Sequence, residues 1–137
     1  MDRAVCERGL EIRREVLGEG YVARAQAQVD DVTRPFQDLL NGYCWGEVWG
    51  RPGLPRKVRS MLNLAMLTAL NRPDELRLHL RGALRNGATR EEIVEVLLQT
   101  AIYCGIPAAN AAFREARQIF AEMDREQTTE LHALAAE

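Results

Sequence analysis

Cysteine and histidine are scarce in this 137-residue sequence, and neither is spaced as metal or redox chemistry requires. Cys6, Cys44 and Cys104 lie far apart, and no His-x-x-x-His or Cys-x-x-Cys motif includes His79 or His132. An odd number of separated cysteines is typical of reduced thiols rather than of a disulfide framework. The sequence therefore predicts no metal site, and we expect any chemistry to come from acid/base side chains in an electrostatically shaped pocket.

Motifs for phosphate binding and for covalent catalysis are also missing. The glycines between residues 42 and 53 have neither the spacing nor the lysine of a phosphate-binding loop. Ser60 and Cys104 are possible nucleophiles, but neither stands in a nucleophile motif with a base nearby in sequence. Nucleotide binding therefore has no support in the sequence.

The sequence has no excess of charge of one sign and no long apolar run. Its 18 basic and 20 acidic residues give a net charge of -2, which argues against a nucleic-acid partner. No segment approaches the roughly 20 apolar residues that span a bilayer. Residues 1–20 mix charged with apolar side chains, unlike a signal peptide. We expect a cytoplasmic protein that binds neither nucleic acid nor a membrane.

Helical periodicity dominates what is present. With 47% hydrophobic residues and no strand-like alternation, the sequence predicts one all-α domain over residues 1–137. Gly18 and Gly20 would end the first helix, Thr89 and Glu92 form a capping box, and the polar tail, residues 124–137, either extends the last helix or frays. The expected helices are residues 2–17, 25–32, 33–43, 55–71, 73–85, 90–103 and 107–123.

Two helical segments raise the question of what covers them. A stripe that includes Val32, Phe36 and Tyr43 is interpreted as core-facing. The helix over residues 90–103 is apolar on most sides, and a domain this small would need a second subunit to cover it. The sequence therefore predicts a homo-oligomer. Arginines 77, 81 and 85 recur every four residues, and we interpret them as a solvated or intersubunit face, with an anion site as the alternative.

Residues 43–55 differ from the helical segments in composition. Aromatic residues, glycines and prolines surround one carboxylate and one cation there. We expect a structured loop in which Glu47 lies between Trp45 and Trp49, with Arg51 just beyond. A carboxylate in an aromatic pocket tends toward a raised pKa and an acid/base role.

Three further polar residues stand against apolar surroundings. They are Arg59, His79 at the edge of a helical stripe, and Tyr103 at a helix end. Each also has a purely structural explanation, and a lone histidine beside an apolar stripe is more often structural than catalytic.

Several segments together resemble the carboxymuconolactone decarboxylase family, specifically its 4-carboxymuconolactone decarboxylase branch. The likeness extends to about residue 123 and rests on IRREVLGEGYV (12–22), WGEVWGRPGL (45–54), RSMLNLAML (59–67) and ELRLHLRGALRNGATREEIVEVLLQTAIYCGIPAANAAF (75–113). It implies a compact helical bundle of the alkylhydroperoxidase D-like type that assembles into a ring-shaped homo-oligomer, a trimer or hexamer, whose subunit contacts help to build the pocket.

The redox branch of this family carries Cys-x-x-Cys-x-x-x-His on the helix that holds His79 here. Arg72 and Glu75 occupy the two cysteine positions, and Ser60 replaces the glutamate that usually follows the helix arginine. Without the thiol pair a peroxidase cycle has no electron carrier. The resemblance therefore implies a decarboxylase and argues against a thiol peroxidase.

The implied activity is cofactor-independent loss of carbon dioxide from a small dicarboxylate lactone, 4-carboxymuconolactone, giving 3-oxoadipate enol-lactone. His79 and Glu47 would be the acid/base pair, Arg51 and Arg59 would anchor the carboxylates or the lactone oxygen, and Trp45 and Tyr103 would shape the pocket. A lactone-processing enzyme or decarboxylase for another small acid, and a non-catalytic ligand-binding protein on the same fold, remain alternatives.

Overall fold

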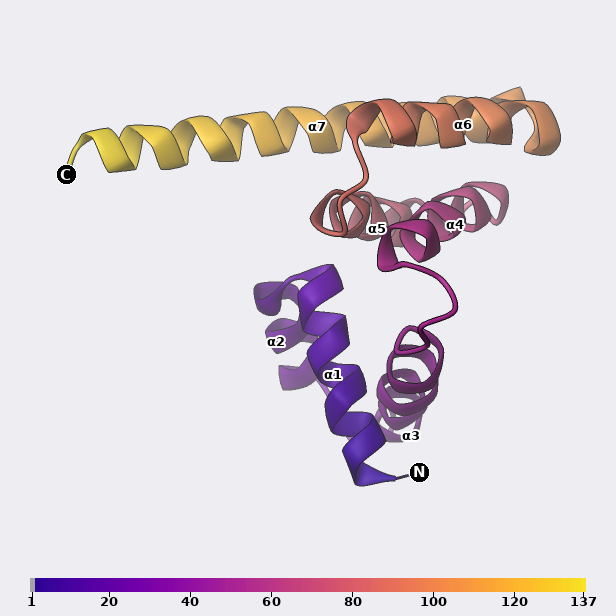
Figure 1. Ribbon diagram of the computed structural model, residues 1–137, viewed down its shortest axis with the longest axis vertical. Helices are drawn as coiled ribbons and strands as arrows, with labels where there is room; N and C mark the ends of the chain where they lie inside the picture. The colour runs from indigo at the N-terminus through magenta and orange to yellow at the C-terminus, as the bar shows by residue number, and fades with distance from the viewer. Residues whose placement is uncertain (1) are drawn as a thin grey trace. The chain divides into compact units, whose positions relative to one another are not determined.

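The computed structural model describes residues 2–137, and the regular secondary structure of this part of the chain is helical, without a β-strand (Figure 1). Seven α-helices and one π-helix, η1, follow one another along the chain. They are α1 (Arg3–Leu17), α2 (Glu19–Ala27), α3 (Arg34–Leu39), η1 (Leu40–Val48), α4 (Arg56–Ala69), α5 (Pro73–Arg85), α6 (Arg90–Cys104) and α7 (Ile106–Ala135).

The described residues divide into two compact units. The first unit contains the residues up to Leu62 together with Gly82–Ala88, and the second contains Asn63–Arg81 and Thr89–Glu137. Helices α4 and α5 each contribute to both units.

The first unit is built on a close contact between α1 and η1. Glycines form this contact: a Cβ added to Gly46 would lie 2.6 Å from the carbonyl oxygen of Val5, and Gly9 faces the backbone of Asn41 and Gly46. Because neither glycine has a side chain, the two helix backbones can approach closely. Apolar side chains bury themselves around the contact, among them Ile12, Val16, Leu17, Val22, Trp45 and Trp49.

A buried arginine also ties α1 to α3 and η1. The side chain of Arg13 is only 3% exposed, and its Nη1 donates to Gln37 Oε1 at 3.0 Å and to Asn41 Oδ1 at 3.1 Å. Burial lowers the pKa of Arg13. The two amide oxygens partly offset the cost of placing this guanidinium inside the unit.

The second unit is built on a helical hairpin. Helices α6 and α7 pack against each other on either side of Gly105, whose φ of 101° favours glycine (Figure 1). The predicted capping box at the start of α6 is confirmed: Thr89 accepts from Glu92 N, and Glu92 accepts from Thr89 N. The buried face consists of Ile93, Leu97, Ala109, Ala112, Ala116 and Ile119.

Two members of the arginine row on α5 form ion pairs with α7. Arg77 reaches Glu115 at 2.6 Å and Glu122 at 2.7 Å, and Arg81 reaches Glu122 at 2.9 Å and Glu126 at 2.9 Å. In the first unit, Arg85 donates to the carbonyl oxygen of Val16. These arginines therefore have partners within the chain, while Arg85 is exposed and Arg77 and Arg81 are partly exposed, so the interpretation as a solvated or intersubunit face stays a prediction.

Several helix boundaries follow the prediction and others do not. The first helix ends at Gly18 as expected, and α5 begins at Pro73, but Gly20 lies inside α2. Helix α7 continues through the polar tail to Ala135. The expected loop over residues 43–55 is wrong in its first half, because η1 continues to Val48 and only the remainder is non-helical.

The interpretation of the stripe around α3 as core-facing is also wrong. Val32 is 86% exposed, and Phe36, Leu39 and Tyr43 are each more than half exposed. Periodicity shows that these apolar side chains share a face, but it does not distinguish a core within the chain from a surface that a partner covers.

Candidate active site

In the second unit, His79 on α5 is the best-defined candidate. The residue is half-buried, and its Nδ1 lies 3.4 Å from the amide nitrogen of Asn63 on α4. Burial lowers the pKa of His79 to about 4, and the nearby negative charge of Glu75 opposes the shift only in part. At neutral pH the imidazole is therefore uncharged.

In the first unit, Arg51 lies at an open depression of about 560 Å³. Trp49 and Ile12 supply an apolar part, Arg8, Arg51 and Arg56 supply positive charge, and Glu11 and Glu15 supply negative charge. Arg56 forms an ion pair with Glu15. A depression with fixed cations beside an apolar surface suits a small organic anion.

The two candidate arginines meet in the same unit. Arg59 Nη2 donates to the carbonyl oxygen of Arg51 at 3.4 Å. The Arg59 Nε is buried and finds no hydrogen-bond acceptor among residues 2–137. A buried donor without an acceptor is costly, so Arg59 keeps a hydrogen bond available for a carboxylate or carbonyl oxygen.

The expected enclosure of Glu47 by two tryptophans is not found. Trp45 and Trp49 are buried, and their rings stack on each other with centroids 4.8 Å apart, while the carboxylate of Glu47 is exposed. On a helix, residues two apart point in different directions, so sequence proximity did not bring the carboxylate between the rings. The tryptophans are core residues that support the wall of the depression.

Tyr103 stands at the last turn of α6 and is 82% exposed. Cys104 next to it is also exposed, although free cysteines in proteins are usually buried. Within the single chain, Tyr103 presents an aromatic surface to solvent.

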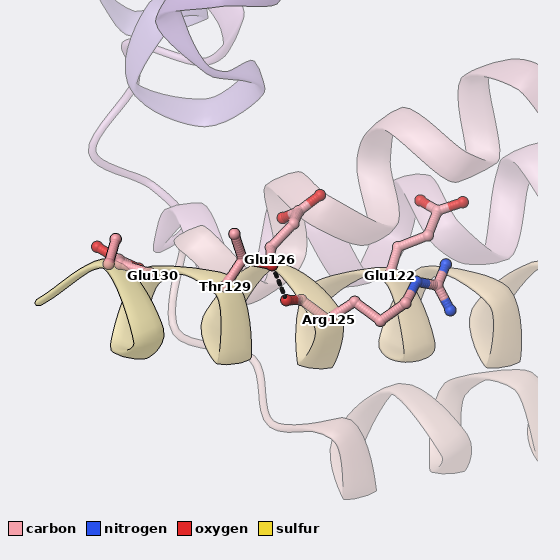
Figure 2. A pocket seen from close by; sticks show the side chains of 6 residues that line it. Glu122, Arg125, Glu126, Thr129 and Glu130 are labelled. Carbon is pink, nitrogen blue, oxygen red and sulfur yellow. Dashed lines mark hydrogen bonds between the residues drawn. The ribbon is translucent and has the colours of Figure 1, made fainter. Parts of the chain in front are cut away.

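A second depression, of about 500 Å³, follows the later turns of α7, and none of the predicted site residues line it. Figure 2 shows carboxylates along one helix, and Thr129 Oγ1 donating to the carbonyl oxygen of Arg125 at 3.0 Å. Glu122 and Glu126 here already pair with Arg77 and Arg81. The depression is therefore lined by α7, and two of its carboxylates are already paired with arginines of α5.

Sequence reasoning missed Asn63, the partner of the imidazole. It precedes His79 by 16 residues and lies on a different helix, so no spacing rule connects the two side chains. Only the packing of α4 against the ring brings them together.

Two searches of the described residues gave negative results. In residues 2–137, no three histidine, cysteine or acidic side chains gather closely enough to hold a metal ion. Nor does this part of the chain contain a helix whose length and apolarity would let it cross a membrane.

Comparison with known proteins identifies the family of this chain. Residues 34–118 match the carboxymuconolactone decarboxylase family, a stretch that includes Glu47, Arg51, Arg59, His79 and Tyr103. A 4-carboxymuconolactone decarboxylase from Acinetobacter baylyi is 46% identical over 122 residues, which is 89% of this chain and 91% of the relative. A nitrosuccinic acid decarboxylase from Metarhizium robertsii is 44% identical over 108 residues, which is 79% of this chain and 76% of that protein. The chain belongs to the carboxymuconolactone decarboxylase family.

Proposed function

We propose that this protein decarboxylates 4-carboxymuconolactone to 3-oxoadipate enol-lactone without a cofactor, as a step in the breakdown of aromatic acids through protocatechuate. The observation that carries the proposal is the 46% identity to a 4-carboxymuconolactone decarboxylase over nearly the full length of both chains. The substrate is a small charged metabolite, which favours a cytoplasmic enzyme.

The substrate supplies its own electron sink. When the bond between the ring carbon and the carboxylate breaks, the electron pair moves through the ring double bond onto the lactone carbonyl, and carbon dioxide leaves. A proton then adds to the carbon beside the carbonyl. The protein must stabilise negative charge on the lactone oxygen and help to deliver this proton.

The proposed roles match the chemistry of the individual side chains. We assign His79 and Glu47 as the acid/base pair, because one is a half-buried imidazole that is uncharged at neutral pH and the other is an exposed carboxyl group. Arg51 and Arg59 anchor the carboxylates or the lactone oxygen, and the unused Nε of Arg59 supports this role. Trp45 supports the pocket wall, and Tyr103 contributes an aromatic surface.

We also propose a ring-shaped homo-oligomer, a trimer or a hexamer. Val94, Leu98 and Ile102 recur every four residues on α6 and are 36%, 48% and 78% exposed. An apolar stripe of this kind is costly to leave in water and is typical of a subunit interface. Tyr103 continues this surface, so a neighbouring subunit could cover it and complete the pocket. Light scattering of the purified protein would give the subunit number, and a monomer would contradict this part of the proposal.

A second candidate function is decarboxylation of a different small acid. The similarity to a nitrosuccinic acid decarboxylase favours it, because that relative is nearly as similar to this chain as the first. Both candidates share the loss of carbon dioxide from a compact polycarboxylate, and they differ in the group that accepts the electron pair.

The deciding experiment is an ultraviolet assay of freshly generated 4-carboxymuconolactone with chelator-treated protein and no added cofactor. Rapid formation of the enol-lactone supports the proposal. Turnover of nitrosuccinic acid alone, measured in parallel, would replace it with the second candidate. A well-folded protein that converts neither acid would contradict both.

Variants of the acid/base pair test the assigned roles. We expect His79→Ala and Glu47→Gln each to lower kcat by roughly a hundredfold to ten-thousandfold, the range for a correctly placed proton-transfer group. Circular dichroism would establish that each variant is folded. If both variants keep most of their activity, the assignment of these two residues is wrong.

A further inference from the structure

The depression beside Arg51 has a wall to which the proposed function gives no role. Helix α1 supplies this wall through Arg8, Glu11 and Glu15, which recur three and four residues apart and therefore share one face of the helix. Arg8 and Glu11 lie outside residues 34–118, where the chain matches the family, and outside the segments that carry the resemblance. All residues that line the depression belong to the first unit, so the site can be described within that unit alone.

The charges around the depression do not all cancel. Arg56 forms an ion pair with Glu15, so these two side chains neutralise each other. The exposed side chains of Arg8 and Arg51 make no hydrogen bond or ion pair with any group of residues 2–137, and the same holds for the carboxylate of Glu11. Two cations and one anion therefore remain to meet a ligand.

We propose that Arg8 and Arg51 form a two-point site for a small dicarboxylate, and that Glu11 is a specificity-determining residue that limits how much negative charge the site accepts. This inference rests on the proposed function, because it places both carboxylates of the substrate in this depression. Arg8 is then a substrate-binding residue in addition to those assigned above.

The form of the depression suits such a ligand. Its volume of about 560 Å³ lies within the usual range of small-molecule sites, and Trp49 and Ile12 offer an apolar surface to the carbon skeleton. Arg8 stands on a helix, and the carbonyl oxygen of Arg51 accepts a hydrogen bond from Arg59, so both arginines start from an ordered backbone. A guanidinium donates two parallel hydrogen bonds to one carboxylate, so two arginines match two carboxylates.

The site also distinguishes the substrate from the product. Decarboxylation removes one of the two carboxylates, so the product engages only one of the two arginines and is released more readily. Glu11 repels each carboxylate that enters, and the penalty increases with the charge of the ligand. Acids with three carboxylates are therefore disfavoured most.

NMR titration tests the two-point site without turnover. The chain has only two tryptophans, so the indole N–H signal of Trp49, assigned with Trp49→Phe, reports on the depression. Glutarate is the dicarboxylate probe, and butyrate is the matched monocarboxylate. We expect Arg8→Gln to weaken glutarate binding about tenfold and butyrate binding less than about threefold, because butyrate can still use Arg51.

Arg14→Gln is the matched control. Arg14 is exposed on the same helix and does not line the depression, so the variant has the same change in net charge and should bind glutarate like the wild type. Equal losses in Arg8→Gln and Arg14→Gln would mean that net charge sets the affinity, and the two-point site would be wrong. A wild-type Trp49 signal that does not respond to glutarate would also overturn the proposal.

A gain of affinity tests the role of Glu11. We expect Glu11→Gln to bind glutarate about threefold more tightly, and the tricarboxylate tricarballylate to gain more than glutarate does. A general loss of structure cannot produce tighter binding. Unchanged affinities for both acids would show that Glu11 does not set the charge preference.

Kinetics separate this inference from the proposed function. With 4-carboxymuconolactone we expect Arg8→Gln to raise KM about tenfold and to change kcat less than about threefold, because Arg8 holds the substrate equally before and during the reaction. If the wild type does not convert this lactone, the proposed function fails, while the titrations still decide whether the depression binds a dicarboxylate. If the wild type is active and Arg8→Gln keeps its KM, the substrate does not use this site, and the inference fails while the proposed function stands.

Discussion

The two units hold their helices together by opposite means. Where α1 meets η1, Gly9 and Gly46 remove side chains so that backbones touch, and the polar group inside, Arg13, is buried. Where α5 meets α7, long side chains bridge the helices, and Arg81 with its partners remains partly exposed to water. The first contact depends on shape and the second on charge.

This difference determines what each contact tolerates. Close packing of backbones leaves no room for a single methyl group, and its strength does not depend on salt. Partly exposed ion pairs tolerate substitution, because water can solvate a lone partner, and ions in solution weaken them. The largest effects of small substitutions should therefore lie in the first unit.

The substitution Gly46→Ala should have the largest effect on stability. The new Cβ would lie 2.6 Å from the carbonyl oxygen of Val5 and 2.8 Å from its Cγ1, so the backbone of α1 must move. We expect a loss of about 3 kcal/mol in the free energy of unfolding and a fall of roughly 10 °C in Tm, measured by denaturant and thermal melts at a fixed protein concentration.

Gly53→Ala is the matched control for this prediction. A Cβ on Gly53 would meet no atom within 4 Å, so the same change should alter stability by less than about 0.5 kcal/mol. Equal losses in the two variants would mean that the α1–η1 contact is looser than its geometry indicates.

Acid should destabilise the protein through His79, a titratable side chain of the second unit. The pKa of His79 is about 4 in the folded chain and near 6.5 when the chain is unfolded. Below pH 6.5 the unfolded chain therefore binds a proton that the folded chain refuses, and stability falls until the pH reaches about 4. We expect a loss of about 2 kcal/mol between pH 7.5 and pH 5, measured by urea unfolding.

A variant without the imidazole isolates this contribution. His79→Gln should show a nearly flat dependence over the same pH range, where carboxylates such as Glu122, whose pKa is lowered by its arginine partners, stay ionised. If the wild type and His79→Gln lose equal stability, the ring is protonated in the folded state.

Features encoded within a few residues were predictable from the sequence. The capping box at Thr89, the helix stop at Gly18 and the start of α5 at Pro73 each depend on the backbone preference of one or two residues. The family resemblance likewise depends on contiguous segments, and the match over residues 34–118 confirms it.

Features that depend on pairing between distant helices were not predictable. The partners of the α5 arginines on α7 were not predicted, because they lie 38 to 45 residues later. Nothing in the sequence around Asn63 indicated its contact with His79. The apolar stripe that includes Phe36 was interpreted as part of the core, but it is exposed. In each case the sequence shows which residues share a face but not what covers that face.

The α5–α7 ion pairs should give the smallest effect and the one that salt changes most. Arg81 connects Glu122 and Glu126, but its side chain is 23% exposed and that of Glu126 is 62% exposed, so water screens the charges. We expect Arg81→Met to cost about 1 kcal/mol at low salt and less than half of that at 1 M salt, because the methionine keeps most of the apolar contact of the arginine stem. Urea unfolding at both salt concentrations measures the loss, with Arg117→Met at an exposed position of α7 as the control. A loss that persisted at 1 M salt would show that α5 and α7 are held by packing, and the contrast between the two units would then be one of degree.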